Sequence, residues 1–370
     1  MKRRQGTTIV DIARLTGLSK STVSRVLTDA PNISDEARDK VREVVRHTGY
    51  RPNDLARSLR SGRTGVVGLV IPDIANPFWA DVARGAQDAA SDSGTSILIF
   101  SSDWDPEREK RHFRALVQAR VDGAIINPVR DSLDDIEDFN IPVVLIGSSA
   151  GRFSGLPSVG SDIEQGVALG LAHTGGLGLS QPTLIVGDAE RSARVRFVAA
   201  VQAHVHGRHR TQDQTNEPLV VEDGHYTVEG GREAMARILS RRQTPDLIFA
   251  ANDLMALGAM QAVRAAGLRC PEDISILGFD GIPAGAVSAP ALTTVVKPSR
   301  QIGASGFALL SEGATGTRHL TLPCTLLERG SVAARALSVP LSDTPPSDTP
   351  PSDTHLSDTF PPRPPLLRAV

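Results

Sequence analysis

Residues 8–27 read TIVDIARLTGLSKSTVSRVL, and this stretch decides how the N-terminal part of the chain folds. Apolar side chains recur at helical spacing on both sides of Gly17, as at Ile12 and Val26. Ala13 supplies the small side chain, and Gly17 the turn former, that a helix-turn-helix needs between its two helices. The stretch therefore predicts a helix-turn-helix.

A third helix is predicted to follow, because Val41 and Val45 continue the helical spacing. Ser19 and Ser34 stand just before the second and third helices, where a side-chain oxygen caps free backbone N–H groups. Gly49 falls where the third helix would end. Together these signals predict a small all-α head.

The second helix of this head would lie in the major groove of DNA with its N-terminal polar face toward the bases. We expect Lys20, Ser21 and Arg25 to read bases, because Lys and Arg match the acceptor pair on guanine and Ser adapts to several base edges. Hydroxyl groups and backbone amides at helix starts favour phosphate contacts. The expected phosphate contacts are Thr8, Ser19, Thr22 and Ser24. The alternative is a polar helix face that is simply solvated.

Charge is distributed unevenly along the 370 residues. Residues 1–63 hold 14 Lys and Arg against 7 Asp and Glu, whereas the remainder holds 26 against 35, for a formal net charge of -2. A basic head on an acidic body indicates that the head alone meets a polyanion.

Beyond Gly65, short aliphatic runs alternate with amphipathic helical patterns such as residues 78–93. The predicted strands are 66–71, 96–100, 123–126, 143–146, 183–186, 247–250 and 274–279. Strands that alternate with helices form parallel sheets, and so many strands fit two doubly wound α/β lobes better than one.

Several function classes lack support in the sequence. Gly-rich segments carry no P-loop lysine, no nucleophile elbow is present, and Cys270 and Cys324 have neither metal-ligand nor redox spacing. His204 and His206 lie two apart on a predicted helix and do not share a face for a metal. We expect a non-enzyme without a cofactor or a metal.

No apolar run reaches about 18 residues, and the opening Met-Lys-Arg-Arg is followed by polar residues. We therefore expect a cytoplasmic protein without membrane contact. Residues 337–370 repeat Ser-Asp-Thr four times among Pro-Pro pairs, a composition that predicts a disordered tail whose role stays open.

Three strings carry a family resemblance: TIVDIA at 8–13, GLSKSTVSRVL at 17–27 and GYRPN at 49–53. They resemble the lactose/galactose repressor family, and the resemblance continues over roughly residues 7–336. It implies a helix-turn-helix domain at 1–51, a hinge helix within 52–63, and at 64–336 a two-lobed effector-binding and dimerisation domain like a periplasmic sugar-binding protein.

By this resemblance the hinge helix, residues 54–60, orders on operator DNA, with Asn53, Ala56, Leu59 and Arg60 contacting it. Leu59 stands at the family's wedge position, where an apolar side chain enters between base steps from the minor groove. The alternative for Leu59 is a buried linker residue.

The resemblance also implies a ligand cleft between the lobes at the carboxyl ends of strands. Phe78 and Trp79 are candidates for stacking on a ring, with a core position as the alternative, and Asn252 for a hydrogen bond, with Asp253 capping the next helix. The expected effector-binding residues are Phe78, Trp79, Ser192, Arg194, Arg196, Tyr226, Asn252 and Asp280. The chain departs from the family at Gly147 and Gly281, where Asp is common.

These features predict a dimeric repressor that binds a palindromic operator and responds to a small molecule, with a sugar or sugar derivative favoured and a purine kept open. A transport-type binding protein and an architectural DNA-binding protein without a ligand are the alternatives. Whether the effector releases the DNA or promotes binding, and whether dimers pair into tetramers, is left open.

Overall fold

The structure is a computed structural model. It describes residues 7–50, 62–129, 136, 140–147, 153, 155–188, 192–208, 218–241, 244–314, 316 and 318–334. The predicted hinge contacts Asn53, Ala56, Leu59 and Arg60 and the predicted tail lie outside these residues.

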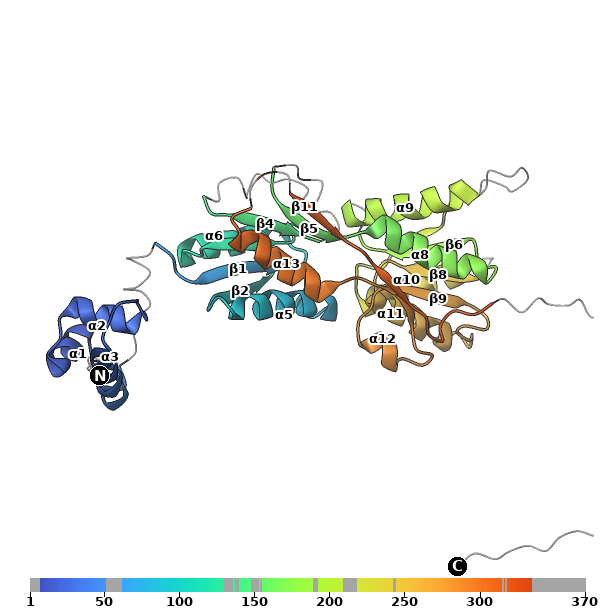
Figure 1. Ribbon diagram of the computed structural model, residues 1–370. Coiled ribbons are helices and arrows are strands. Elements are labelled where there is room, and N and C mark those ends of the chain that lie inside the picture. The colour runs from blue at the N-terminus through green and yellow to red at the C-terminus, as the bar shows by residue number, and fades with distance from the viewer. Residues whose placement is uncertain are drawn as a thin grey trace, which may run out of the picture. The chain divides into compact units, whose positions relative to one another are not determined.

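The N-terminal head contains three helices, α1 (Ile9–Thr16), α2 (Lys20–Leu27) and α3 (Asp35–Thr48) (Figure 1). Thr8, Ser19 and Ser34 are the N-caps, and each side chain accepts a hydrogen bond from a backbone N–H of its helix. Gly17 and Gly49 adopt the left-handed conformation at φ 67° and 61°, which ends α1 and α3. The predicted helices and caps match the structure.

The head has a core of its own, made by Ile12, Val23, Val26 and Val41, none of which is more than 4% exposed. Helices of eight residues are marginal in isolation, so this shared burial holds α1 and α2 together.

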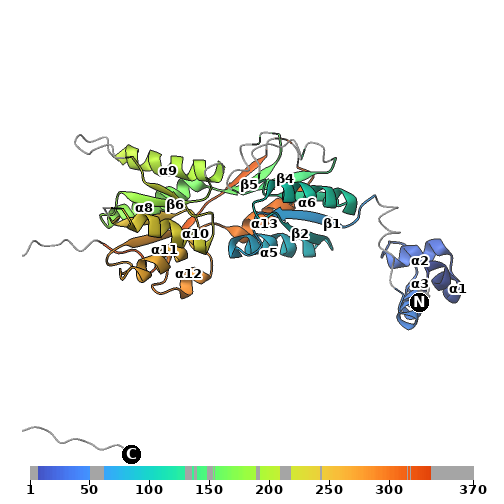
Figure 2. The ribbon, with the colours of Figure 1, turned by 180° about the vertical axis from the view of Figure 1, so that it is seen from behind.

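The first lobe of the body, the N-lobe, is a six-stranded parallel sheet with the order β11-β5-β4-β3-β1-β2. Its strands are β1 (Val66–Ile71), β2 (Ser96–Ser101), β3 (Gly123–Ile126), β4 (Val143–Ile146), β5 (Ser158–Ser161) and β11 (His319–Leu322). One face is covered by α5 (Pro77–Ser91) and α13 (Ser299–Ser311), and the other by α6 (Pro106–Ala119) (Figures 1 and 2).

The second lobe, the C-lobe, has the order β12-β10-β9-β8-β6-β7. Its strands are β6 (Pro182–Val186), β7 (Val221–Asp223), β8 (Leu247–Ala250), β9 (Ser275–Asp280), β10 (Thr293–Val296) and the antiparallel β12 (Thr325–Leu327). Its helices are α8 (Ile163–Gly176), α9 (Ser192–Arg208), α10 (Val228–Leu239), α11 (Asp253–Ala265) and the short α12 (Ala284–Val287). Helices α8 and α9 cover one face of the sheet, and α10 and α11 the other.

The chain passes between the two lobes three times, at residues 162, 297–298 and 323–324. Because α13 and β11 return to the N-lobe and β12 to the C-lobe, both sheets depend on C-terminal residues (Figure 1). The predicted pair of doubly wound lobes is confirmed.

The seven predicted strands lie within one residue or so of those observed, but β5, β7, β10, β11 and β12 were not predicted. All five are edge or next-to-edge strands. Four of them have sequences such as VED and HLTL, which carry no aliphatic run. No helix in the described part of the chain is long and apolar enough to cross a membrane.

Candidate nucleic-acid interface and candidate ligand cleft

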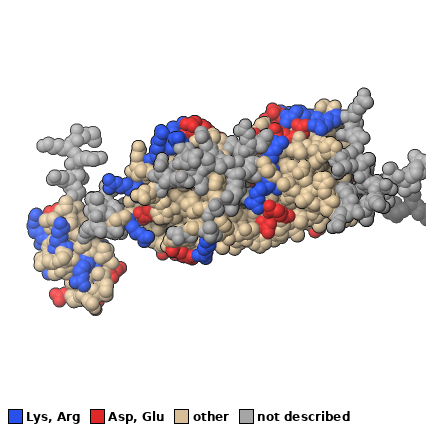
Figure 3. Space-filling view, turned by 90° about the horizontal axis from the view of Figure 1, so that it is seen from above, with Lys and Arg blue, Asp and Glu red and all other residues tan. Residues whose placement is uncertain are grey.

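Helix α2 presents a polar face on the surface of the head. Lys20, Ser21 and Arg25 are exposed, whereas Val23 and Val26 on the same helix are buried. Figure 3 shows Lys and Arg side chains on the surface of the head. The three residues predicted to read bases are therefore accessible to a groove.

Hydrogen bonds within the head order this face. The Ser19 Oγ accepts from the Thr22 backbone N–H at 3.0 Å and lies within 2.7 Å of the Ser21 hydroxyl. Arg25 donates to the Pro31 carbonyl at 3.0 Å, and the Thr8 hydroxyl donates to Asp11 at 2.7 Å. Arg25 must exchange its carbonyl partner to reach a base, whereas Lys20 extends into solvent.

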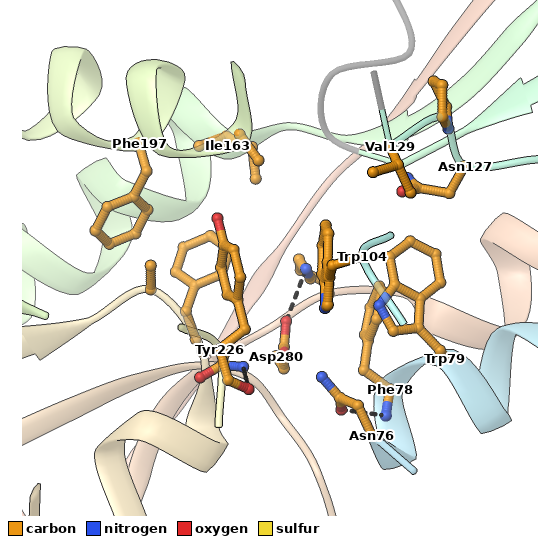
Figure 4. A pocket seen from close by; sticks show the side chains of 16 residues that line it. Asn76, Phe78, Trp79, Trp104, Asn127, Val129, Ile163, Phe197, Tyr226 and Asp280 are labelled. Carbon is orange, nitrogen blue, oxygen red and sulfur yellow. Dashed lines mark hydrogen bonds and ion pairs between the residues drawn. The ribbon is translucent and has the colours of Figure 1, made fainter. Parts of the chain in front are cut away.

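The cleft between the N-lobe and the C-lobe encloses a cavity of about 80 Å³. Both lobes contribute to its lining, in which aromatic rings alternate with side-chain amides and one pair of charged groups (Figure 4). Such a volume holds several water molecules, and aromatic walls with a few fixed polar groups are typical of small-molecule sites.

Aromatic rings form two walls of the cleft. At the start of α5, Phe78 and Trp79 meet edge to face with centroids 5.0 Å apart. Trp104, which follows β2, stacks on Tyr226, which follows β7, at 5.0 Å and 16° (Figure 4). Trp104 and Tyr226 both have a left-handed backbone, with φ 59° and 58°. The stacked pair joins the two lobes across the cleft.

Three asparagines in the lining are held by backbone groups. Asn76 caps α5 by accepting from the Phe78 N–H at 3.0 Å, and Asn127 donates to the Ile146 carbonyl at 2.7 Å. Asn252 caps α11 by accepting from the Met255 N–H and donates to the Tyr226 carbonyl at 3.0 Å. Their remaining hydrogen-bonding positions therefore have fixed directions.

The charged pair in the lining consists of Asp280, at the end of β9, and Lys297, just after β10. Lys297 Nζ lies 2.7 Å from Asp280 Oδ1, and the two side chains are 12% and 3% exposed. The same Nζ is 3.9 Å from the centre of the Phe78 ring, within cation–π range. Burial raises the pKa of Asp280, and the neighbouring Lys297 opposes that rise.

The prediction that Asp253 caps α11 is wrong, because Asn252 holds that position. Asp253 is instead fully buried and accepts hydrogen bonds from the Thr294 hydroxyl at 2.5 Å and from the Gly281 and Ile282 N–H groups at 2.8 Å each. Burial, with a further contribution from Asp280, raises its pKa to about 7. Asp253 thus holds the turn that directs Asp280 into the cleft.

Five of the eight predicted effector residues lie together in the cleft lining. They are Phe78, Trp79, Tyr226, Asn252 and Asp280.

The two predicted arginines are placed differently. Arg194 forms an ion pair with Asp223 and donates to the Gly187 carbonyl at 3.1 Å, and Arg196 pairs with Glu164 on α8 at 2.9 Å. Neither arginine lines the described cavity; from the start of α9, Ala193 lines it instead. The side chain of Ser192 lies outside the described residues, so the effector roles of these three residues stay predictions.

Sequence reasoning missed Trp104, Asn127 and Lys297 in the lining. Each follows the carboxyl end of a strand, and that rule alone could have identified Trp104 and Asn127. Lys297 follows β10, which was not predicted as a strand, so its signal was not visible.

The departure from the family at Gly147 has a steric reason. Its φ is 102°, and a Cβ there would lie 2.1 Å from Nδ2 of Asn127. Gly281 has a φ of 81°, and its Cβ would lie 2.8 Å from the Val296 side chain. The left-handed backbone, together with these close side-chain contacts, therefore favours glycine at both positions.

Comparison with known proteins agrees with this architecture. Residues 8–53 match the family model of the bacterial regulatory proteins of the lacI family, and residues 167–332 match a periplasmic binding protein-like domain. The chain is 32% identical over 340 residues to the HTH-type transcriptional regulator DegA of Bacillus subtilis, which covers 88% of this chain and 98% of that protein. The chain belongs to the lacI family. It is a transcriptional regulator and not an enzyme, as predicted.

Other similar proteins are a repressor and two regulators whose structures were solved as complexes. The ribose operon repressor of Halalkalibacterium halodurans is 33% identical over 82% of this chain and 89% of its own length. The lac repressor dimer bound to operator and the anti-inducer ONPF superposes with a TM-score of 0.79 at 27% identity, over 89% of this chain and all of that one. A complex of the regulator CelR with cellobiose gives a TM-score of 0.64 at 26% identity, over 88% and 99%.

Proposed function

We propose that this regulator is a cytoplasmic repressor that binds a palindromic operator as a homodimer and is controlled by a sugar or sugar derivative. The observation that carries the DNA-binding part is the exposed polar face of α2, where Lys20, Ser21 and Arg25 project from a helix whose opposite side is buried. A recognition helix in the major groove needs this division.

The cleft supports a ring-shaped ligand with hydroxyl groups. Phe78, Trp79 and the stacked pair of Trp104 and Tyr226 offer flat apolar faces, and the asparagines with Asp280 offer fixed polar groups. A relative named as a ribose operon repressor and a solved complex of CelR with cellobiose fit the same ligand class.

The three passages of the chain between the lobes support coupling between the cleft and DNA. A ligand that contacts both lobes favours one relative arrangement of them, and each N-lobe is preceded in the chain by the hinge and the head. If the ligand changes the affinity for the operator by some factor, the operator changes the affinity for the ligand by the same factor.

Selection from a random duplex pool tests the proposed DNA binding. The full chain at fixed salt is expected to enrich a palindrome whose half-sites are separated by about one helical turn. Arg25→Ala should lower affinity for that duplex and relax base choice at one position of each half-site by about 1 to 3 kcal/mol.

Lys40→Ala, which removes an equal charge from the exposed surface of α3, is the matched control and should leave base choice unchanged. If the full chain enriches no sequence, or if Arg25→Ala and Lys40→Ala give the same selected sequences as the unmodified chain, the proposed mode of DNA recognition is wrong.

A further inference from the structure

We propose that Asp280 masks the cation of Lys297 and thereby restricts the cleft to uncharged, hydroxyl-bearing ligands and excludes phosphorylated ones. This inference rests on the proposed function, because it names the ligand class of the same cleft. It assigns specificity to Lys297, which forms part of the site together with its carboxylate partner.

The geometry gives the pair no freedom to act as separate charges. Lys297 Nζ lies 2.7 Å from Asp280 Oδ1, and both side chains are almost completely buried. The Phe78 ring covers the ammonium at 3.9 Å, and the Phe279 ring lies 5.9 Å from it. The ammonium is therefore enclosed by a carboxylate and aromatic faces.

Asp280 is held in this position by its own backbone. Its φ is 145°, the following Gly281 has φ 81°, and Asp253 accepts hydrogen bonds from the N–H groups of Gly281 and Ile282. This turn fixes the direction in which the Asp280 side chain leaves the backbone, toward Lys297. The backbone thus places the carboxylate beside the ammonium in the cleft.

Among the described residues that line the cleft, Asp280 and Lys297 are the only charged side chains, and they neutralise each other. The nearby Arg194 is paired with Asp223 and lies outside this lining. In the described part of the lining, a ligand therefore meets aromatic faces, amides and an internal ion pair with no net charge.

A phosphate group cannot use Lys297 under these conditions. It would have to displace the carboxylate, or approach Lys297 beside that negative charge in a poorly solvated space, and either route is unfavourable. A sugar hydroxyl has no such difficulty, because it donates to a carboxylate oxygen and accepts from the ammonium at the same time.

Asp280→Asn tests the masking directly. It removes the negative charge while keeping a side chain of nearly the same shape, and leaves the Lys297 cation beside a neutral amide. The variant should acquire a site for anions that the unmodified chain lacks.

The probe is inorganic phosphate, titrated into the full chain and followed by calorimetry, with sulfate as a second anion. Phosphate should bind Asp280→Asn at least about tenfold more tightly than the unmodified chain, and Asp280→Asn/Lys297→Met should lose that gain. Asp273→Asn, which removes an exposed carboxylate paired with Arg269, is the matched control and should gain nothing.

Two results overturn the proposal: phosphate binding to the unmodified chain as tight as to Asp280→Asn, or a gain that Lys297→Met does not remove. If Asp280→Asn does not fold, the unmodified chain still decides the question with matched pairs such as D-ribose and D-ribose 5-phosphate. Binding of a phosphate ester that exceeds binding of its free sugar contradicts the proposal, and the reverse supports it.

Failure of this inference is separate from failure of the proposed function. The phosphate titration needs neither an operator nor a known effector, whereas the duplex selection is indifferent to the charge in the cleft. A chain that selects a palindrome but binds phosphate without substitution would remain a DNA-binding regulator with an anionic effector.

Discussion

The two lobes repeat one strand order but place different chemistry at equivalent strand ends. Trp104 follows β2 in the N-lobe and Tyr226 follows β7 in the C-lobe, and the two rings stack on each other. After β4, however, the chain has Gly147, whereas the equivalent β9 ends in Asp280.

This difference divides the work of the cleft between the lobes. Both lobes contribute rings and amides, but among the described lining residues the carboxylate comes from the C-lobe, together with the buried Asp253 that holds its turn. In the C-lobe, Asp253 supplies the hydrogen bonds that hold the turn after Asp280.

Placing a carboxylate after β4 in the N-lobe should have the largest effect of the changes that test this difference between the lobes. Gly147→Asp places a Cβ 2.1 Å from Asn127 Nδ2 at a φ of 102°. Clash and backbone strain together should lower the free energy of unfolding by about 4 kcal/mol. Urea unfolding measures the loss, and Gly155→Asp, at a glycine with open space around it, should change little. Equal midpoints for the two variants would show that the N-lobe tolerates a carboxylate at residue 147.

Replacing the buried Asp253 tests the C-lobe, because it removes the acceptor that holds the turn after Asp280. Asp253→Ala leaves the Gly281 and Ile282 N–H groups and the Thr294 hydroxyl without their acceptor, which should cost about 3 kcal/mol of stability. Urea unfolding provides the measurement, with Asp273→Ala as an exposed control that should lose much less. A loss no greater than that of the control would remove the orienting role of Asp253.

The raised pKa of Asp253 makes the free energy of unfolding depend on pH. Its pKa is about 7 in the folded protein, against 3.8 for an unperturbed aspartate, so between these values the folded chain holds a proton that the unfolded chain has released. The free energy of unfolding should therefore fall as pH rises from about 4 to 7. Asp253→Asn, which does not titrate, should show a shallower fall in urea unfolding series across this range. Parallel curves for the two proteins would contradict the buried, protonated carboxyl.

The smallest expected effect concerns the ring pair that joins the lobes. A double-mutant cycle with Trp104→Ala and Tyr226→Ala should give a coupling of about 1 kcal/mol in the free energy of unfolding. Trp104→Ala combined with Tyr50→Ala in the head is the control cycle and should be additive. Additivity in both cycles would mean that the stack contributes nothing across the cleft.

Local signals made the head predictable from the sequence. Ser19, Ser34, Gly17 and Gly49 act within a few residues of their own position, so the caps and ends of the three helices follow from chain order alone. The central strands were equally clear, because burial on both faces demands aliphatic runs.

The cleft was only partly predictable because it depends on tertiary contacts. Phe78, Tyr226 and Asp280 were found from strand ends and family strings, but the helix cap expected of Asp253 is made by the adjacent Asn252, and Asp253 is buried. Both residue types cap helices, and only the fold decides which of the two turns inward to Thr294. Lys297 was missed because its value depends on a carboxylate 17 positions earlier in the chain.

The most direct test of the central claim is a titration of the selected operator by fluorescence anisotropy, with and without each of a series of uncharged monosaccharides and disaccharides. We predict that at least one of them changes the operator dissociation constant about tenfold for the unmodified chain. The same sugar should have a much smaller effect on the Asp280→Asn variant. If no uncharged sugar alters operator binding, or if the variant responds as fully as the unmodified chain, the cleft described above is not the site that controls DNA binding.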